Sequence, residues 1–258
     1  MYHADGTVHF SDLKQLAKSP AHYLHAVMFP RVATRPMRIG TLVDFALIGD
    51  ASPIIFDGDR RGKAWETFRD SFPAGTEIYT RAEAVDAHQI IASARLDPQA
   101  REYLGLDDPT RRTQVPLSWT VNGVPRSTRG VDVLIGNRLV DLKVTNCTEP
   151  GRFGWHARKM MWHAQLADYE EACRQNNIDV SGGLYLVGIE STAPHCVTVL
   201  RMTPAALEEG RRCVASWIET FKSCAESNQW PGYVQSPVDL DVDAPSFGEA
   251  EELDEEAA

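Results

Sequence analysis

Two tight-turn signals in the middle of the chain constrain the fold more than any other feature of the sequence. Asn122-Gly123 and Gly136-Asn137 each separate two segments rich in β-branched residues. Two-residue connections of this composition are typical of β-hairpins, because Asn and Gly readily adopt positive φ angles. The pattern therefore predicts three consecutive antiparallel strands, over residues 113–121, 126–135 and 138–145.

Helical patterns flank these three strands on both sides. Thr80 and Glu83 have the spacing of a capping box, which starts a helix that reaches about residue 96. Downstream we expect a long helix over 153–176, two strands over 182–190 and 195–202, and a last helix from Pro204 to about 227. This order predicts an α+β fold, preceded by an all-helical N-terminal segment.

The amount of apolar sequence fits one domain. With 258 residues and 43% hydrophobic content, the chain can bury one large core. We expect a single domain over 1–235, with a helical part over 1–75 and a core over 76–228.

The net charge of −10 is concentrated at one end. Residues 239–258 contain nine acidic residues and no basic ones, which leaves 26 basic against 27 acidic residues in the rest of the chain. We expect residues 236–258 to form a disordered acidic tail, whose charge does not exclude a nucleic-acid enzyme.

Several classes of protein are poorly supported. The five cysteines are widely spaced and form no CxxC pair, which argues against a disulfide framework, a zinc ribbon or an iron–sulfur cluster. No apolar run approaches the roughly 20 residues that cross a bilayer, and no secretory signal is visible. We expect a cytoplasmic protein without a membrane association.

Three charged residues interrupt the predicted apolar strands. Asp132 lies in the second strand, and Asp141 and Lys143 lie two residues apart in the third. Side chains alternate along a strand, so Asp141 and Lys143 share one face, and the tight turn can bring Asp132 beside Asp141. Two adjacent carboxylates repel each other unless a cation lies between them, and their oxygens suit Mg²⁺ or Mn²⁺. The alternative is that both Asp residues simply favour strand ends near turns, with Lys143 paired to one of them.

These residues resemble the signature of a known superfamily. Gly130-Val131-Asp132 followed by Asp141-Leu142-Lys143 resembles the motif of the PD-(D/E)xK nucleases. Gln165 and Tyr169 resemble the QxxxY helix motif of its exonuclease branch. Segments 10–23 and 40–44 resemble the N-terminal part of RecE-type (exonuclease VIII-like) recombination exonucleases of phages and prophages. The resemblance implies a restriction-endonuclease-like core: a helix, a three-stranded antiparallel meander, a helix and further strands.

The resemblance also implies roles for particular residues. The implied metal ligands are Asp44, Asp132, Asp141 and the Leu142 carbonyl, and the implied catalytic residues are Asp132, Asp141, Lys143 and Gln165. The expected DNA-binding residues are Tyr169, Arg129, Arg158 and Lys159. Two positions depart from the family pattern, because Asp44 stands where a His ligand is usual and Gln114 where a Glu is common.

The implied activity is hydrolysis of linear double-stranded DNA from its ends. It would depend on Mg²⁺ or Mn²⁺ and would serve phage-type recombination or DNA repair. The resemblance further implies 5′→3′ polarity, a ring-like homo-oligomer and a single-strand annealing protein as partner. The two departures motivate an alternative, a catalytically impaired nuclease-fold module that binds DNA or protein.

Overall fold

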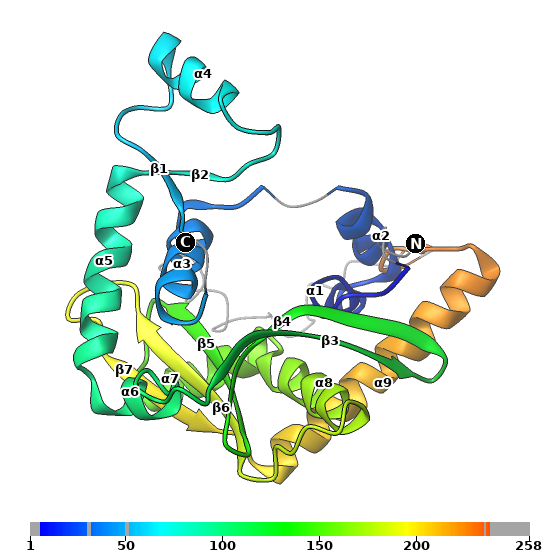
Figure 1. The fold of residues 1–258 in the computed structure, drawn as a ribbon. Helices are drawn as coiled ribbons and strands as arrows, with labels where there is room; N and C mark the ends of the chain where they lie inside the picture. The colour runs from blue at the N-terminus through cyan, green and yellow to red at the C-terminus, as the bar shows by residue number, and fades with distance from the viewer. Residues whose placement is uncertain (1–5, 30–31, 50–51, 235, 238–258) are drawn as a thin grey trace, which may run out of the picture.

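The protein has an α+β fold built on one mixed five-stranded sheet (Figure 1). The computed structural model describes residues 6–29, 32–49, 52–234 and 236–237, so the predicted acidic tail lies almost entirely outside the described residues. The strands occur in sequence order across the sheet: β3 (Arg112–Val121), β4 (Val124–Ile135), β5 (Arg138–Thr145), β6 (Gly183–Glu190) and β7 (Val197–Arg201). Strands β5 and β6 are parallel, and the other neighbours are antiparallel.

The predicted three-stranded meander is confirmed. Asn122 and Gly123 connect β3 to β4 with φ angles of 48° and 81°, the double positive φ that a type I′ turn requires. The β3–β4 pairing is long, whereas the β4–β5 pairing extends only from Ile135↔Arg138 to Val133↔Val140. Beyond Val133 the two strands separate, and the charged residues lie at this point.

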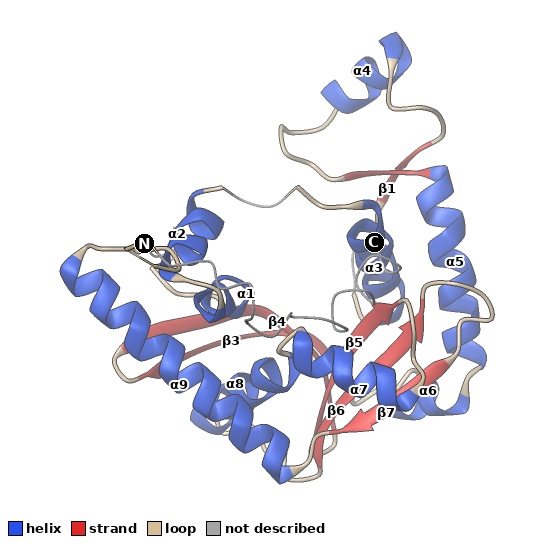
Figure 2. Ribbon diagram, turned by 180° about the vertical axis from the view of Figure 1, so that it is seen from behind, coloured by secondary structure: helices blue, strands red, loops and turns tan. Residues whose placement is uncertain are grey.

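Helices cover both faces of the sheet (Figure 2). One face carries α7 (Pro150–Lys159), α8 (Trp162–Gln175) and α9 (Pro204–Ser227), and the other carries α3 (Arg35–Leu47), α5 (Arg81–Leu96) and α6 (Pro98–Tyr103). Phe153 of α7 lies directly over Gly188 of β6, where an added Cβ atom would come within 2.4 Å of the ring. A larger residue at position 188 would therefore push α7 off the sheet.

The prediction of one long helix over 153–176 is wrong, because the helix is interrupted at Met161. This residue has a φ of 61°, in the left-handed region, so α7 ends at Lys159 and α8 begins at Trp162. The break allows Phe153 and Trp162 to bury their rings in one apolar cluster, with ring centroids 6.0 Å apart.

A third apolar cluster joins the two ends of the described chain. Helix α1 (Phe10–Leu13), the 3₁₀ helix η1 (Lys14–Ala17) and helix α2 (Pro20–Met28) pack against α9. The rings of Tyr23 and Phe221 meet edge-on with centroids 5.4 Å apart, and the ring centroids of Phe10 and Trp217 are 6.1 Å apart.

The all-helical N-terminal part predicted over 1–75 needs one correction. Strand β1 (Ile54–Phe56) pairs in parallel with β2 (Ile78–Thr80), and helix α4 (Gly62–Asp70) lies between them in sequence. These strands are too short to show a periodic pattern. Helix α3 of the same part packs on the main sheet. Residues 54–80, hereafter the arm, project from the rest of the molecule (Figures 1 and 2).

None of the helices in the described part of the chain is long and apolar enough to cross a membrane. All five cysteines are free.

The capping box at the start of α5 is confirmed and belongs to a larger polar cluster. Glu83 accepts hydrogen bonds from the Thr80 backbone N–H at 2.7 Å and from Arg38 Nε at 2.7 Å, and it pairs with Arg60 at 3.0 Å. Burial alone would raise the pKa of Glu83, but the hydrogen bonds from Arg38 and Thr80 lower it to about 2. Glu83 therefore fastens the arm to α3 and α5.

Replacing Glu83 with Gln should make the protein less sensitive to acid. The folded pKa of about 2 lies below the ordinary 4.5, so the stabilisation is complete above pH 4.5 and disappears as the pH falls towards 2. The difference in unfolding free energy between wild type and variant should narrow by about 3 kcal/mol over this interval. Urea unfolding at several pH values measures it, with the exposed Glu66→Gln as control. A constant difference would contradict the prediction.

Candidate functional site

The candidate site lies at the fork where β4 and β5 separate. Beyond the last ladder pair, the Asp132 carboxylate takes the place of a strand partner and accepts a hydrogen bond from the Leu142 backbone N–H at 2.8 Å. The side chain of Asp132 is thereby fixed against β5, and Asp141 and Lys143 lie on either side of Leu142. The strand geometry thus holds two carboxylates and an amine in one place.

Lys143 forms an ion pair with Asp141, two residues earlier in β5. Its Nζ atom lies 2.5 Å from Asp141 Oδ2 and 5.7 Å from the centre of the Trp162 ring, and its side chain is 20% exposed. Burial alone would lower the pKa of Lys143, but the charges of Asp141 and Asp132 raise it above its usual range. Lys143 is therefore held as a cation.

Asp44 interacts with the same site from α3, which packs on one face of the sheet. Burial raises the pKa of Asp44 to about 7, Lys143 lowers it, and Asp141 raises it. Burial also raises the pKa of Asp132 well above its usual range, and repulsion from Asp141 adds to the effect. Three carboxylates and one amine therefore interact here, and the single Lys143 could not balance the charge of all three carboxylates in their ionised form.

The donor chemistry of this cluster fits a divalent cation. Carboxylate oxygens and a backbone carbonyl are the hard ligands that Mg²⁺ and Mn²⁺ prefer. The arrangement is not a preformed cage, because no three His, Cys, Asp or Glu side chains in the described part of the chain are grouped closely enough to hold a metal ion. Lys143 lies against Asp141, where it supplies part of the positive charge that the carboxylates need.

Gln114 lies at the edge of the site. Gln114 has a φ of 49°, and its Nε2 atom is 3.5 Å from Asp132 Oδ1, a long and weak contact. Gly130 allows this close approach, because an added Cβ atom would lie within 2.8 Å of Gln114 backbone atoms. The Gly-Val-Asp segment therefore has a steric reason to begin with glycine.

Gln165 and Tyr169 share one face of α8, as their spacing predicts. Gln165 Nε2 donates to the Tyr169 hydroxyl at 3.1 Å, and Thr128 Oγ1 of β4 donates to the same oxygen at 3.2 Å. Tyr169 is only 7% exposed. This burial favours a positioning role over direct contact with DNA, which stays a prediction.

The three basic residues predicted to bind DNA are all exposed and come from two elements, β4 and α7. Arg129 lies on β4, three residues before Asp132, whereas Arg158 and Lys159 lie in the last turn of α7. Arg158 pairs with Glu209 of α9 at 2.8 Å, and Lys159 lies 5.1 Å from the ring centre of Trp155. Arg129 is thus the nearest of the three to the fork along the chain.

Two further features near the site are not predicted by the sequence analysis. Trp162 is buried, and its ring also contacts Lys143. Next to Tyr169, Asp168 is completely buried and pairs with the equally buried Arg126 at 2.6 Å. Trp119 Nε1 also donates to Asp168, at 3.2 Å. An aromatic residue three positions before the QxxxY motif could have suggested the first feature, whereas the second joins residues from distant strands and helices.

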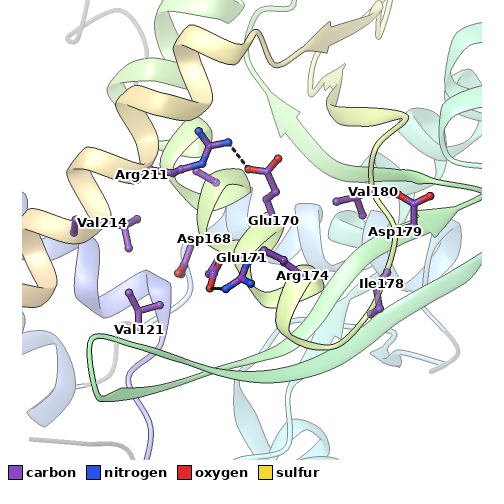
Figure 3. A pocket seen from close by; sticks show the side chains of 12 residues that line it. Val121, Asp168, Glu170, Glu171, Arg174, Ile178, Asp179, Val180, Arg211 and Val214 are labelled. Atoms are coloured by element: carbon purple, nitrogen blue, oxygen red, sulfur yellow. Dashed lines mark hydrogen bonds and ion pairs between the residues drawn. The ribbon is translucent and has the colours of Figure 1, made fainter.

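A separate cavity of about 550 Å³ is lined by residues other than those of the fork (Figure 3). It opens between α8, α9, the end of β3 and the segment 178–180. Arg211 pairs with Glu170 across its rim at 2.7 Å, and Arg174 pairs with Glu171. Its arginines are thus neutralised by acidic neighbours, and the cavity is distinct from the fork.

Comparisons with known proteins give a fold but no family. No protein-family model matches the sequence, and a search of curated proteins finds no match. The fold is similar to a crystal structure from Eubacterium rectale named "Putative exonuclease", with a TM-score of 0.57 over 91% of each chain and 16% sequence identity. At this identity the similarity shows a shared fold.

Proposed function

We propose that this protein is a metal-dependent exonuclease that hydrolyses phosphodiester bonds at the ends of linear double-stranded DNA. The observation that carries the proposal is the fork between β4 and β5, where Asp44, Asp132, Asp141 and Lys143 interact. Of these residues, Asp132, Asp141 and Lys143 resemble the PD-(D/E)xK signature. The named exonuclease of similar fold supports the same class of activity.

Asp44, Asp132, Asp141 and the Leu142 carbonyl would hold Mg²⁺ or Mn²⁺. When bound, the ion supplies positive charge against the scissile phosphate and acidifies a water molecule. Asp132 is oriented for this role by its hydrogen bond from the Leu142 N–H. That bond fixes the Asp132 carboxylate relative to β5, the strand that carries Asp141 and Leu142.

Lys143 would act on the substrate rather than on the ion. A protonated amine beside Asp141 can move towards the scissile phosphate and stabilise the negative charge that develops during hydrolysis. The Trp162 ring limits the movement of the amine on one side. Gln165, oriented by Tyr169, would orient the amine or the attacking water, and Arg129, Arg158 and Lys159 would bind the phosphates of the DNA.

The biological setting belongs to the same proposal. The resemblance to recombination exonucleases favours 5′→3′ digestion of linear duplex in the cytoplasm. It also favours a homo-oligomer that passes its product to a single-strand annealing protein.

The direct test incubates purified protein with linear and covalently closed duplex DNA, with Mg²⁺ or with a chelator. We expect loss of the linear DNA alone, and only with Mg²⁺. Asp141→Asn should lower the rate by about 100-fold or more, because it removes a charge from the metal site. Chelator-resistant digestion, or full activity in the variant, would overturn the proposal.

The second candidate is a nuclease-fold module that binds nucleic acid without cleaving it. Gln114 in place of the usual Glu, and the absence of a preformed three-ligand metal site among the described residues, favour it. It predicts metal-independent binding to duplex ends without digestion in the same assay. An Mn²⁺ binding signal in calorimetry that disappears in Asp132→Ala would count against it.

A further inference from the structure

A second large cavity lies between the arm and the start of α3. Its volume is about 900 Å³, within the range of ligand-binding pockets. One wall comes from Val32, Ala33 and Arg38, and the opposite wall comes from α4 and the segment that follows it to β2.

The arm presents aromatic side chains that the main cores do not cover. Trp65, Phe68 and Phe72 follow one face of the α4 segment, and both Trp65 and Phe68 contact Phe56 of β1, with ring centroids 5.4 and 5.0 Å apart. Helix α4 has no buried residue, and Trp65 and Phe72 line the cavity. The rings are thus ordered by one another and remain accessible to a flat ligand.

Three guanidinium groups line the same cavity, from Arg38, Arg60 and Arg69, against the acidic Asp70 and Glu77. The Arg69 side chain is 53% exposed and forms an ion pair with its neighbour Asp70. Exposed ion pairs contribute little to the stability of a protein, so a phosphate can take the place of Asp70 beside Arg69. Arg60 is 33% exposed and lies 5.9 Å from the Trp65 ring centre. Its partner Glu83 is also bonded to Arg38 and Thr80, so Arg60 can turn towards a ligand without leaving Glu83 unpaired.

One residue that lines the cavity, Arg38, belongs to α3, the helix that also carries Asp44. Arg38 and Asp44 are six residues apart on α3. This separation corresponds to about 9 Å of helix rise. It is about the length of two to three nucleotides spaced as in a DNA strand.

We propose that this cavity is a subsite for single-stranded DNA, in which a base stacks on Trp65 and phosphates bind Arg69 and Arg60. The proposal rests on the proposed function and deepens it. In it, the arm binds one strand of the DNA substrate, which runs from the fork along α3. Aromatic stacking combined with Arg contacts is the general means by which proteins bind single strands without regard to sequence.

The test measures fluorescence anisotropy of a short fluorescein-labelled oligothymidylate in the presence of a chelator, so that binding is separated from cleavage. Trp65→Ala and Arg69→Ala should each raise the Kd for this oligonucleotide by about tenfold. Trp65→Phe should retain most of the affinity, because a phenyl ring still stacks. The matched control is Arg174→Ala, an exposed arginine of α8 paired to a near neighbour in the same way, and it should leave the Kd unchanged.

Two results would overturn the inference. The first is an unchanged Kd in both Trp65→Ala and Arg69→Ala with circular dichroism spectra like that of the wild type. The second is an unchanged Kd with an altered sedimentation coefficient, which would make the arm a contact between copies of the chain. Asp141→Asn separates this inference from the proposed function, because it should abolish cleavage and keep the affinity for the oligonucleotide.

Discussion

Lys143→Ala should lower the rate of phosphodiester hydrolysis by about 10²–10³-fold, the usual cost of removing one preorganised positive group from a developing negative charge. The amine lies 2.5 Å from Asp141 Oδ2, and the two carboxylates near it hold it in the charged form. Measurement of kcat and KM on linear duplex tests this. The loss should appear in kcat, because Lys143 is half-buried and paired with Asp141, and it contributes little to the capture of DNA.

Lys143→Arg is the matched variant. It keeps the charge but places a larger, planar group against the Trp162 ring, so we expect it to recover only part of the rate. If Lys143→Ala instead raised KM and left kcat unchanged, Lys143 would be a binding residue, and its proposed role in hydrolysis would be wrong.

Asp168→Ala should lower the free energy of unfolding by about 3–5 kcal/mol, because it leaves the charge of Arg126 buried without a partner. Both side chains are completely buried, and Arg126 Nε also donates to the Val8 carbonyl at 2.8 Å. Burial raises the pKa of Asp168 to about 6, although Arg126 lowers it. Urea unfolding at neutral pH, followed by circular dichroism, measures the effect.

The double variant Arg126→Met/Asp168→Leu distinguishes two causes of instability, the unpaired charge of Arg126 and the loss of packed side-chain volume. It removes both charges and keeps much of the apolar volume, so it should be clearly more stable than Asp168→Ala. If Asp168→Ala lowered the free energy of unfolding by less than about 1 kcal/mol, water would reach Arg126. The ion pair would then contribute to stability only as much as a pair on the surface.

The features predictable from the sequence are those that local chemistry specifies. Asn122-Gly123 predicted the hairpin because few residues tolerate two successive positive φ angles, and Thr80 with Glu83 predicted the start of α5. The alternation of side chains along β5 likewise predicted that Asp141 and Lys143 would share a face, and they form an ion pair.

The features that the sequence did not predict depend on contacts between distant segments. Met161 is an ordinary helix-forming residue, and its left-handed conformation follows from the burial of the rings on either side. The parallel pairing of β1 with β2 joins two three-residue strands across the whole of α4. The Arg126–Asp168 pair joins β4 to α8. None of these contacts leaves a periodic pattern in the sequence.

The packing of α1 and α2 on α9 has a consequence for synthesis of the chain. Tyr23 leaves the ribosome early, but its partner Phe221 belongs to the last helix. At elongation rates of about 5–20 residues per second, the N-terminal helices wait about 10–40 s for the surface that covers them. During that time Phe10, Leu13 and Tyr23 are exposed to chaperones and to other nascent chains, so the yield of folded protein depends on how that interval is protected.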